Sequence, residues 1–295
     1  MDEIQVNPLI KHGWLRVIVM IIPYTLVVGL FQLAGLLLIS QVKGKDFMEL
    51  INQLENNRGD LSQFLVIQLF TLIGALLVIW AFRKVIDRRS LHSLGFSLRK
   101  KGKDIFLGIL IGAVTMMAGS LILWAMGLLE ITDAGFIAST FLTSLILCIA
   151  IALNEEILVR GYVLNNFMMS FNKYVALILS ALLFAILHIF NPNTSVLGMF
   201  NLFLAGILLG ASYIYTKNLW FPVALHFSWN FFQGPVFGFH VSGLDMNAVI
   251  IQKPQEEQLF SGGTFGFEGS ILATILSLVM IAWVVYNFRG QEAKA

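Results

Sequence analysis

The sequence predicts an all-α fold: a polytopic membrane helix bundle of about eight transmembrane helices. Hydrophobic residues make up 58% of the 295 residues and charged residues only 12%, whereas a typical soluble domain has about 25% charged residues. The mean hydropathy is +0.82. Apolar runs close to the ~20 residues that a helix needs to span a bilayer recur along the whole chain. These observations exclude a pair of ordinary soluble domains.

The expected elements follow from the apolar runs and the breaks between them. The mixed-charge segment 41–60 is expected to form a short interfacial helix, and the polar segments 130–135 and 240–269 are expected to connect neighbouring spans. A helix satisfies its own backbone hydrogen bonds in lipid, so no strand is required anywhere. The first run exceeds the usual signal-peptide core, and no cleavage site follows it. The expected spans are 14–39, 61–82, 105–129, 136–170, 174–190, 196–215, 220–237 and 271–288.

Basic residues predict the orientation and a division of the chain. Residues 83–103 contain eight lysines and arginines, so the positive-inside rule places this loop in the cytoplasm of a cell-membrane protein. With eight spans, both termini also face the cytoplasm, although Lys43, Lys45 and Arg58 then lie outside. We divide the chain into 1–104 (two helices and the basic loop), 105–238 (a catalytic core) and 239–295 (a loop and the final span).

Composition also limits the partners. The net charge of +2, with no basic and aromatic interleaving, excludes a nucleic-acid partner. The single cysteine, Cys148, lies in an apolar run and is expected to serve packing. Membrane lipid and a peptide or protein substrate, lipidated or not, are the partners that we expect.

The segment 151–164, IALNEEILVRGYVL, places three charges inside an otherwise apolar span. Each costs about 2.5–3.5 kcal/mol at the centre of a membrane helix. Glu156 and Arg160 are four residues apart with the acid first, which is the favourable order for an ion pair on one helical face. Glu155 points about 100° away and gains no such partner, so it is the unexplained charge.

Two later spans carry polar groups that could meet Glu155. Glu155 precedes the turn near 170–173 by about as many residues as His188 follows it. Both should therefore lie at similar depth in an antiparallel hairpin. His226 and Asn230 share one face of another span, with Gln233 one turn further on. That span follows a turn near 217–218, and the sequence leaves its relative depth open.

Several other polar residues are not expected to have a function. His12, His92 and His240 lie at ends or in loops and are expected to be solvated, and Asn201 is expected to form an interhelical hydrogen bond.

Six polar residues inside the apolar spans form the candidate functional set, because ionisable groups inside membranes are functional by default. The set is Glu155, Glu156, Arg160, His188, His226 and Asn230.

The chemistry that suits such a set is hydrolysis by water. A glutamate beside a neutral histidine can hold and deprotonate a water molecule. A histidine and an asparagine on one helical face can donate to the oxyanion of a tetrahedral intermediate. We find no candidate serine or cysteine nucleophile in the same place.

Three motifs resemble those of a known family. NEEILVRG resembles EExxxR, FAILH resembles FxxxH and HFSWN resembles HxxxN of the CPBP intramembrane peptidases, which include the CAAX-protease or Rce1-like and ABI proteins. The resemblance implies a bundle of about eight helices with a cavity open to the cytosol. It also implies that Glu155 activates water with His188, that His226 and Asn230 form the oxyanion hole, and that Glu156 and Arg160 are a supporting pair.

Two alternatives stay open at this point. Glu155, His188 and His226 are a plausible zinc set, although no HExxH spacing is present; otherwise no cofactor is expected. A non-catalytic protein, such as a bacteriocin-immunity factor or a transporter, could use the same cluster for binding, but no repeat typical of transporters is found.

Overall fold

Helices form most of the computed structural model, which describes residues 7–55, 60–253 and 259–291. Six of the helices in this part are long and apolar enough to cross a membrane, which confirms a polytopic helical bundle. The α-helices are α1 (Gly13–Lys43), α2 (Phe47–Glu55), α3 (Leu61–Val85), α4 (Gly102–Ala125), α5 (Ala138–Glu156), α6 (Asn165–Phe167), α7 (Lys173–Leu187), α8 (Val196–Thr216), α9 (Trp220–Phe231) and α10 (Ile271–Phe288). Short 3-10 helices occur at η1 (Leu91–Leu94), η4 (Gly263–Phe265) and η5 (Phe267–Gly269).

Two of the eight expected spans give shorter helices than predicted. Helix α7 has 15 residues and α9 has 12, so the expectation of eight full-length spans is wrong by length for these two. Helix α7 ends at Leu187; Pro192 follows five residues later and would prevent the helix from continuing beyond Phe190. Helix α9 continues into a π-helical turn, η3 (Phe232–Val236), which contains Pro235.

The fourth expected span is not one continuous α-helix. It consists of α5, a π-helical segment η2 (Ile157–Leu164) and the short helix α6. π-Helical turns are rare and occur frequently at functional sites. This irregular segment begins directly after the two glutamates.

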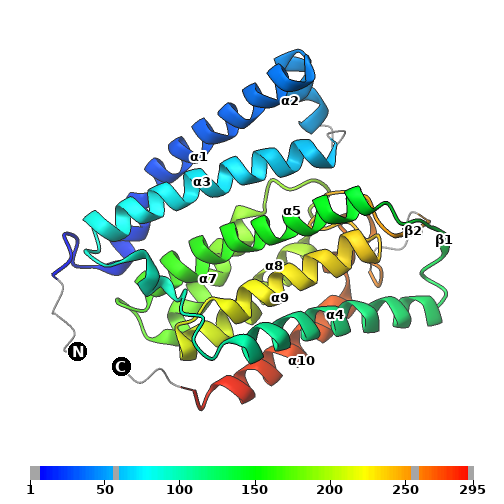
Figure 1. The fold of residues 1–295 in the computed structure, drawn as a ribbon. Helices are drawn as coiled ribbons and strands as arrows, with labels where there is room; N and C mark the ends of the chain where they lie inside the picture. Colours follow the sequence, from blue (N-terminus) through cyan, green and yellow to red (C-terminus); the bar gives the residue numbers. More distant parts are fainter. Residues whose placement is uncertain (1–6, 56–59, 254–258, 292–295) are drawn as a thin grey trace.

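Neighbouring helices pack in both antiparallel and parallel pairs; α4 and α9 run in the same direction, as do α8 and α10 (Figure 1). Helices α1 and α3 form a hairpin that packs through α3 on α5, α9 packs between α5 and α4, and α8 packs between α7 and α10. Helices α8 and α9 are buried over most of their length. On α1, by contrast, Ile22, Leu26 and Leu30 are exposed on one stripe, as expected of a helix that faces lipid.

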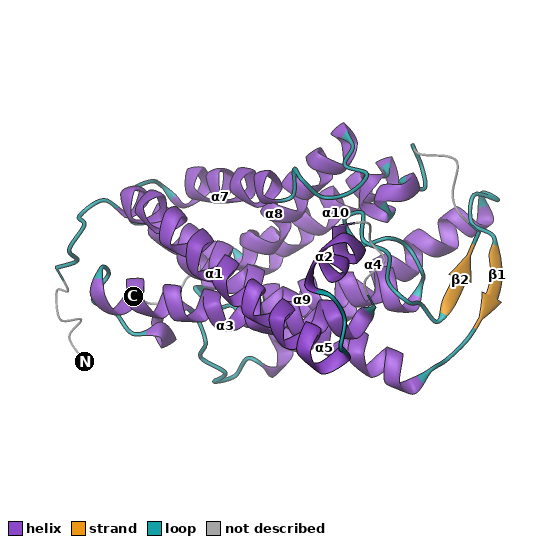
Figure 2. Ribbon diagram, turned by 90° about the horizontal axis from the view of Figure 1, so that it is seen from above, coloured by secondary structure: helices purple, strands orange, loops and turns teal. Residues whose placement is uncertain are grey.

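The two ends of the bundle differ, and we name them by their contents. One end, the basic end, holds residues 83–103, the start of α1 and the end of α10 (Figure 1). The other, the sheet end, holds a two-stranded antiparallel sheet of β1 (Ile131–Ala134) and β2 (Ile250–Gln252), in which Ile131 pairs with Gln252 (Figure 2). Among the described residues, no span contains a strand, as expected, and this small sheet lies in the segments that connect the spans. The sheet lies beyond the helices, where its open edges need not be satisfied in hydrocarbon.

A buried ion cluster holds the basic end together. Asp87 accepts from Nη1 of Arg83 at 2.8 Å and from Nη1 of Arg16 at 3.4 Å. The same Arg16 nitrogen lies 3.1 Å from Oδ1 of Asn166. The Asp87 side chain is completely buried. The cluster joins α1, α3 and α6, so Arg83 supports the fold although the positive-inside rule counts it as a loop charge.

Glycines allow α4 and α9 to approach closely. An added Cβ at Gly108 would lie 2.8 Å from the carbonyl oxygen of Phe221, and one at Gly112 would lie 2.7 Å from Cβ and Oγ of Ser228. The hydroxyl of Ser228 donates to the carbonyl oxygen of Ile109 at 2.6 Å. Two glycines four apart that let backbones meet are typical of membrane helix interfaces. This contact positions the helix that carries His226 and Asn230.

We predict that Gly112→Ala lowers the free energy of unfolding by about 1–3 kcal/mol, because the new methyl group overpacks the α4–α9 interface. Thermal unfolding of the detergent-solubilised protein measures the change. Gly29→Ala is the matched control, because Gly29 lies in α1 with nothing within 4 Å of an added Cβ. It should keep or raise stability. An equal loss in both variants would contradict the packing explanation.

Candidate functional site

An ion pair lies at the centre of the site. Nη1 of Arg160 is 2.7 Å from Oε1 of Glu156, and both side chains are completely buried. Arg160 also donates from Nη2 to the carbonyl oxygen of Gly206 at 2.9 Å, and its guanidinium lies 4.6 Å from the ring centroid of Phe184. The i,i+4 spacing predicts this pair, which forms although Arg160 lies in the π-helical segment. The pair holds η2 against α7 and α8.

His226 binds to the same carboxylate. Its Nδ1 lies 2.8 Å from Oε1 of Glu156. A carboxylate paired with arginine is ionised and only accepts, so Nδ1 of His226 donates and Nε2 is left for the cavity. A carboxylate on Nδ1 also stabilises the imidazolium form, as in a Ser-His-Asp triad. Glu156 therefore orients His226.

His188 and Glu155 meet opposite this network. Nδ1 of His188 lies 2.7 Å from the carbonyl oxygen of Phe184. A carbonyl oxygen only accepts, so this nitrogen carries a proton. Oε2 of Glu155 then lies 3.7 Å from Nε2 of His188 and 3.8 Å from Nε2 of His226. Glu155, which no residue of its own helix partners, thus faces two imidazole nitrogens from other helices.

Glu155, His188 and His226 line a cavity of about 440 Å³. Glu155 is the most accessible of them, with 28% of its side chain exposed, against 13% for His188. Asn230 is buried on the cavity wall, and its amide has no hydrogen-bond partner within the part of the chain that the structure covers. An unpartnered buried amide facing a cavity is available to a ligand.

The N-terminal hairpin contributes a wall that the sequence reading missed. Tyr24 and Gln32 of α1 and Gln68 of α3 line the same cavity. Gln32 donates to Oγ1 of Thr71 at 3.1 Å, and Gln68 to the carbonyl oxygen of Ala150 at 3.4 Å. The sequence did contain a signal for this wall, because Gln32 and Gln68 are polar residues inside apolar spans, which is unusual.

The loop before α10 contributes a third carboxylate and a serine. Glu268 and Ser242 both line the cavity, and Oε2 of Glu268 accepts from the backbone N–H of Ser242 at 2.8 Å and from its hydroxyl at 2.7 Å. The sequence predicts no serine nucleophile at the site, and Ser242 does not have the setting of one. The Ser242 hydroxyl points to a carboxylate instead of to a histidine. No periodicity in this loop could have indicated either residue.

The other residues named from the sequence have mostly structural places. Cys148 is fully buried and free, and Asn201 links helices by donating to the carbonyl oxygens of Glu268 and Ser270 and accepting from Thr274.

The loop and terminal histidines differ from one another. His12 and His92 are exposed, as expected. His240 is partly exposed, with 34% of its side chain accessible. Its Nδ1 is bound to the carbonyl oxygen of Thr264 at 2.8 Å, and its own carbonyl oxygen accepts from the buried Gln233 at 2.6 Å.

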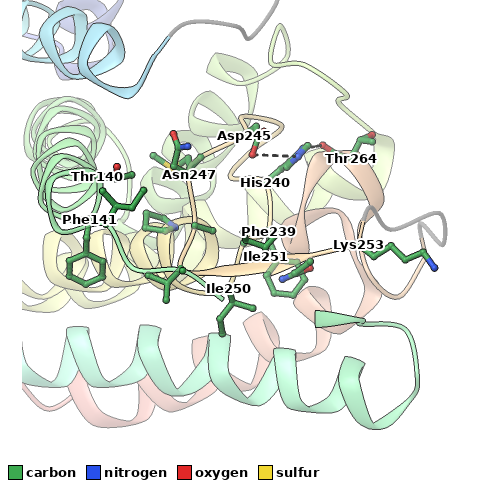
Figure 3. A pocket seen from close by; sticks show the side chains of 18 of the residues that line it. Thr140, Phe141, Phe239, His240, Asp245, Asn247, Ile250, Ile251, Lys253 and Thr264 are labelled. Carbon is green, nitrogen blue, oxygen red and sulfur yellow. Dashed lines mark hydrogen bonds and ion pairs between the residues drawn. The ribbon is translucent and has the colours of Figure 1, made fainter. Parts of the chain in front are cut away.

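A second cavity of about 510 Å³ lies at the sheet end (Figure 3). His240 and Asp245 line it, with Nε2 and Oδ1 4.0 Å apart. None of the six residues of the intramembrane polar set lines this cavity. The turn between His240 and Asp245 separates it from the first cavity.

Among residues 7–55, 60–253 and 259–291, no group of three or more His, Cys, Asp or Glu side chains is arranged to hold a metal ion. The separations of 3.7 and 3.8 Å between Glu155 and the two histidines are longer than direct hydrogen bonds. The zinc alternative therefore stays a prediction for experiment.

One family model matches part of the chain. Residues 137–232 match the family model described as type II CAAX prenyl endopeptidase, Rce1-like, which confirms the resemblance over this segment. Comparisons with curated proteins and with solved structures gave no match. The six residues of the polar set lie inside the matched segment, whereas Tyr24, Gln32, Gln68, Ser242 and Glu268 lie outside it.

Removing one partner of the central ion pair should destabilise the fold. Arg160→Met leaves the Glu156 carboxylate buried with only His226 beside it, and we predict a loss of about 3–5 kcal/mol in the free energy of unfolding. In the double variant Glu156→Gln/Arg160→Met, no buried charge is left unpaired, and part of the loss should be recovered. Chemical unfolding in detergent compares the two. A double variant less stable than Arg160→Met would show that the pair itself, instead of charge balance, is required.

Proposed function

We propose that this chain is an intramembrane endopeptidase, similar to CAAX prenyl protease 2, that hydrolyses a peptide bond with water activated by Glu155 and His188. The observation that carries the proposal is the Glu155 carboxylate facing the Nε2 atoms of two histidines in a largely apolar cavity. The family match over residues 137–232 supports it.

Water activation follows from the protonation of His188. Because Nδ1 carries the proton, Nε2 of the neutral ring is an acceptor. A water molecule between Nε2 of His188 and Oε2 of Glu155 can donate one hydrogen to each. Glu155 removes a proton as the water oxygen attacks the scissile carbonyl carbon, which is general-base catalysis.

The attack turns the carbonyl oxygen into an oxyanion that needs donors. An imidazolium His226, stabilised by Glu156, donates from Nε2, and Asn230 donates from its unpartnered amide. Glu155 then returns its proton to the amide nitrogen as the C–N bond breaks. The products are a carboxylic acid and an amine, and the enzyme is regenerated without a covalent intermediate.

The proposed setting is a cell membrane, with lipid around the helices and both termini in the cytoplasm. The substrate is a peptide or protein, and a prenylated tail is one candidate because leucine side chains line much of the cavity.

Experiment must separate this proposal from two alternatives. One is a zinc-dependent reaction at Glu155, His188 and His226, and the other is a non-catalytic binding role for the cluster.

We predict that Glu155→Gln and His188→Ala each lower kcat by about 10²–10⁴, because each removes a partner of the attacking water. Purified protein in detergent is assayed with internally quenched peptides, including a farnesylated CAAX peptide, with and without a strong chelator. Chelation should leave the rate unchanged. Glu130→Gln, at an exposed glutamate, is the matched control and should keep the wild-type rate.

Each alternative has its own outcome. Inactivation by chelator with recovery on adding zinc would establish the zinc reaction. A cellular role, such as bacteriocin immunity, that survives both Glu155→Gln and His188→Ala would support the non-catalytic role. Retained activity in Glu155→Gln would overturn the proposed base.

Asn230→Ala should lower kcat by about 10²–10³ with little change in KM, because an oxyanion donor acts chiefly in the transition state. The same substitution at Asn287, on the exposed face of α10, controls for general effects of losing an amide. Steady-state kinetics on the best peptide of the panel measures both. A rise in KM with kcat unchanged would assign Asn230 to substrate binding instead.

A further inference from the structure

Among the described Asp, Glu, Lys and Arg residues, only glutamates line the first cavity. Two carboxylates, Glu155 and Glu268, line the cavity, and no lysine or arginine of the described residues does. Arg160 is buried behind the wall and already paired with Glu156. Gln32 and Gln68 add neutral polar side chains to the same cavity. Glu155 faces His226 at 3.8 Å, whereas Glu268 has no cationic side chain beside it among the described residues, and in an apolar bundle such a carboxylate favours a cationic ligand.

Glu268 is held rigidly on this wall. It lies in η5, and the amide of Asn201 donates to its backbone carbonyl oxygen at 2.7 Å. Its Oε2 accepts two hydrogen bonds from Ser242, which lies in the turn Val241–Leu244. The Ser242 carbonyl oxygen accepts from the amide of Asn191 at 3.1 Å. The carboxylate is thereby positioned before any ligand arrives.

The turn itself has little freedom. Gly243 has φ +85°, and a Cβ there would lie 1.9 Å from the carbonyl oxygen of Pro192. Its backbone N–H donates to the carbonyl oxygen of Phe265 at 2.9 Å. On the far side of the turn, His240 and Asp245 face the second cavity. The wall that presents Glu268 is therefore a fixed part of the fold.

Glu268 is buried without a cationic partner among the described residues. Glu268 is only 7% exposed, and no lysine or arginine within the described ranges forms an ion pair with it. Both hydrogen bonds go to Oε2, so Oε1 is left without one from the described residues. A buried carboxylate without a cation is costly, and a cationic side chain that enters the cavity removes that cost.

We propose that Glu268 selects substrate peptides that carry a lysine or arginine beside the scissile bond. The cationic side chain binds the Glu268 carboxylate while the peptide bond lies between Glu155 and Asn230. This inference rests on the proposed peptidase function and names its substrate class. A desolvated, charge-assisted contact of this kind is worth about 1.5–3 kcal/mol, equivalent to about 10-fold to 100-fold in kcat/KM.

The test uses quenched peptides in which one residue is varied as lysine, glutamine or glutamate, scanned through the positions that flank the scissile bond. Wild type in a non-ionic detergent should cut the best lysine peptide about 10-fold to 100-fold faster than its glutamine counterpart, with the glutamate peptide slowest. Glu268→Gln keeps the acceptor for Ser242 but loses the charge, so it should remove this preference. Ser242→Ala weakens the anchoring of the turn and keeps the charge, so it should retain the preference.

A binding measurement separates this inference from the proposed function. Fluorescence anisotropy compares labelled lysine and glutamine peptides on Glu155→Ala and on Glu155→Ala/Glu268→Gln, which requires no turnover. Tighter binding of the lysine peptide that depends on Glu268 supports the inference even if wild type cuts no peptide, an outcome that would count against the peptidase. Cleavage without charge preference, or a preference that persists in Glu268→Gln, would overturn the inference and leave the peptidase standing.

Discussion

The ion pair between Glu156 and Arg160 is the interaction on which the rest of the site depends. Both charges are completely buried in an apolar bundle, where a single unpaired charge would cost several kcal/mol. Each partner also binds a second element: Arg160 reaches Gly206 of α8, and Glu156 orients His226 of α9. Pairing the charges therefore joins three helices at one depth and places the histidine ring against the cavity.

Two histidines with their Nδ1 atoms engaged give the cavity its chemical polarity. Nδ1 of His188 binds a backbone carbonyl oxygen, whereas Nδ1 of His226 binds a carboxylate. In the proposed reaction the two rings therefore take different roles, the first as an acceptor for water and the second as a donor to the oxyanion. The difference arises from the first hydrogen bond of each ring, as in other sites where environment assigns acid and base roles.

The cavity is not contained in the segment that carries the three motifs. The α1–α3 hairpin closes one side with Tyr24, Gln32 and Gln68, and the loop before α10 closes another with Ser242 and Glu268. Regions 1–104 and 239–295 therefore contribute walls to the core that we predict at 105–238, although that division itself stays a prediction. Walls built from outside residues 137–232 are where differences in substrate preference can arise while the motifs stay the same.

The sequence alone determined the fold class, nearly all of the helical segments and the pairing of Glu156 with Arg160, because hydropathy and i,i+4 spacing act locally along the chain. It also brought Glu155 and His188 to similar depth, since equal helix lengths flank one turn. Only the tertiary structure decided that His226 binds Glu156, that α7 and α9 are short, and that Glu268 and Ser242 face the cavity. These features depend on how far each hairpin projects and how an irregular loop folds back, and no periodicity records either.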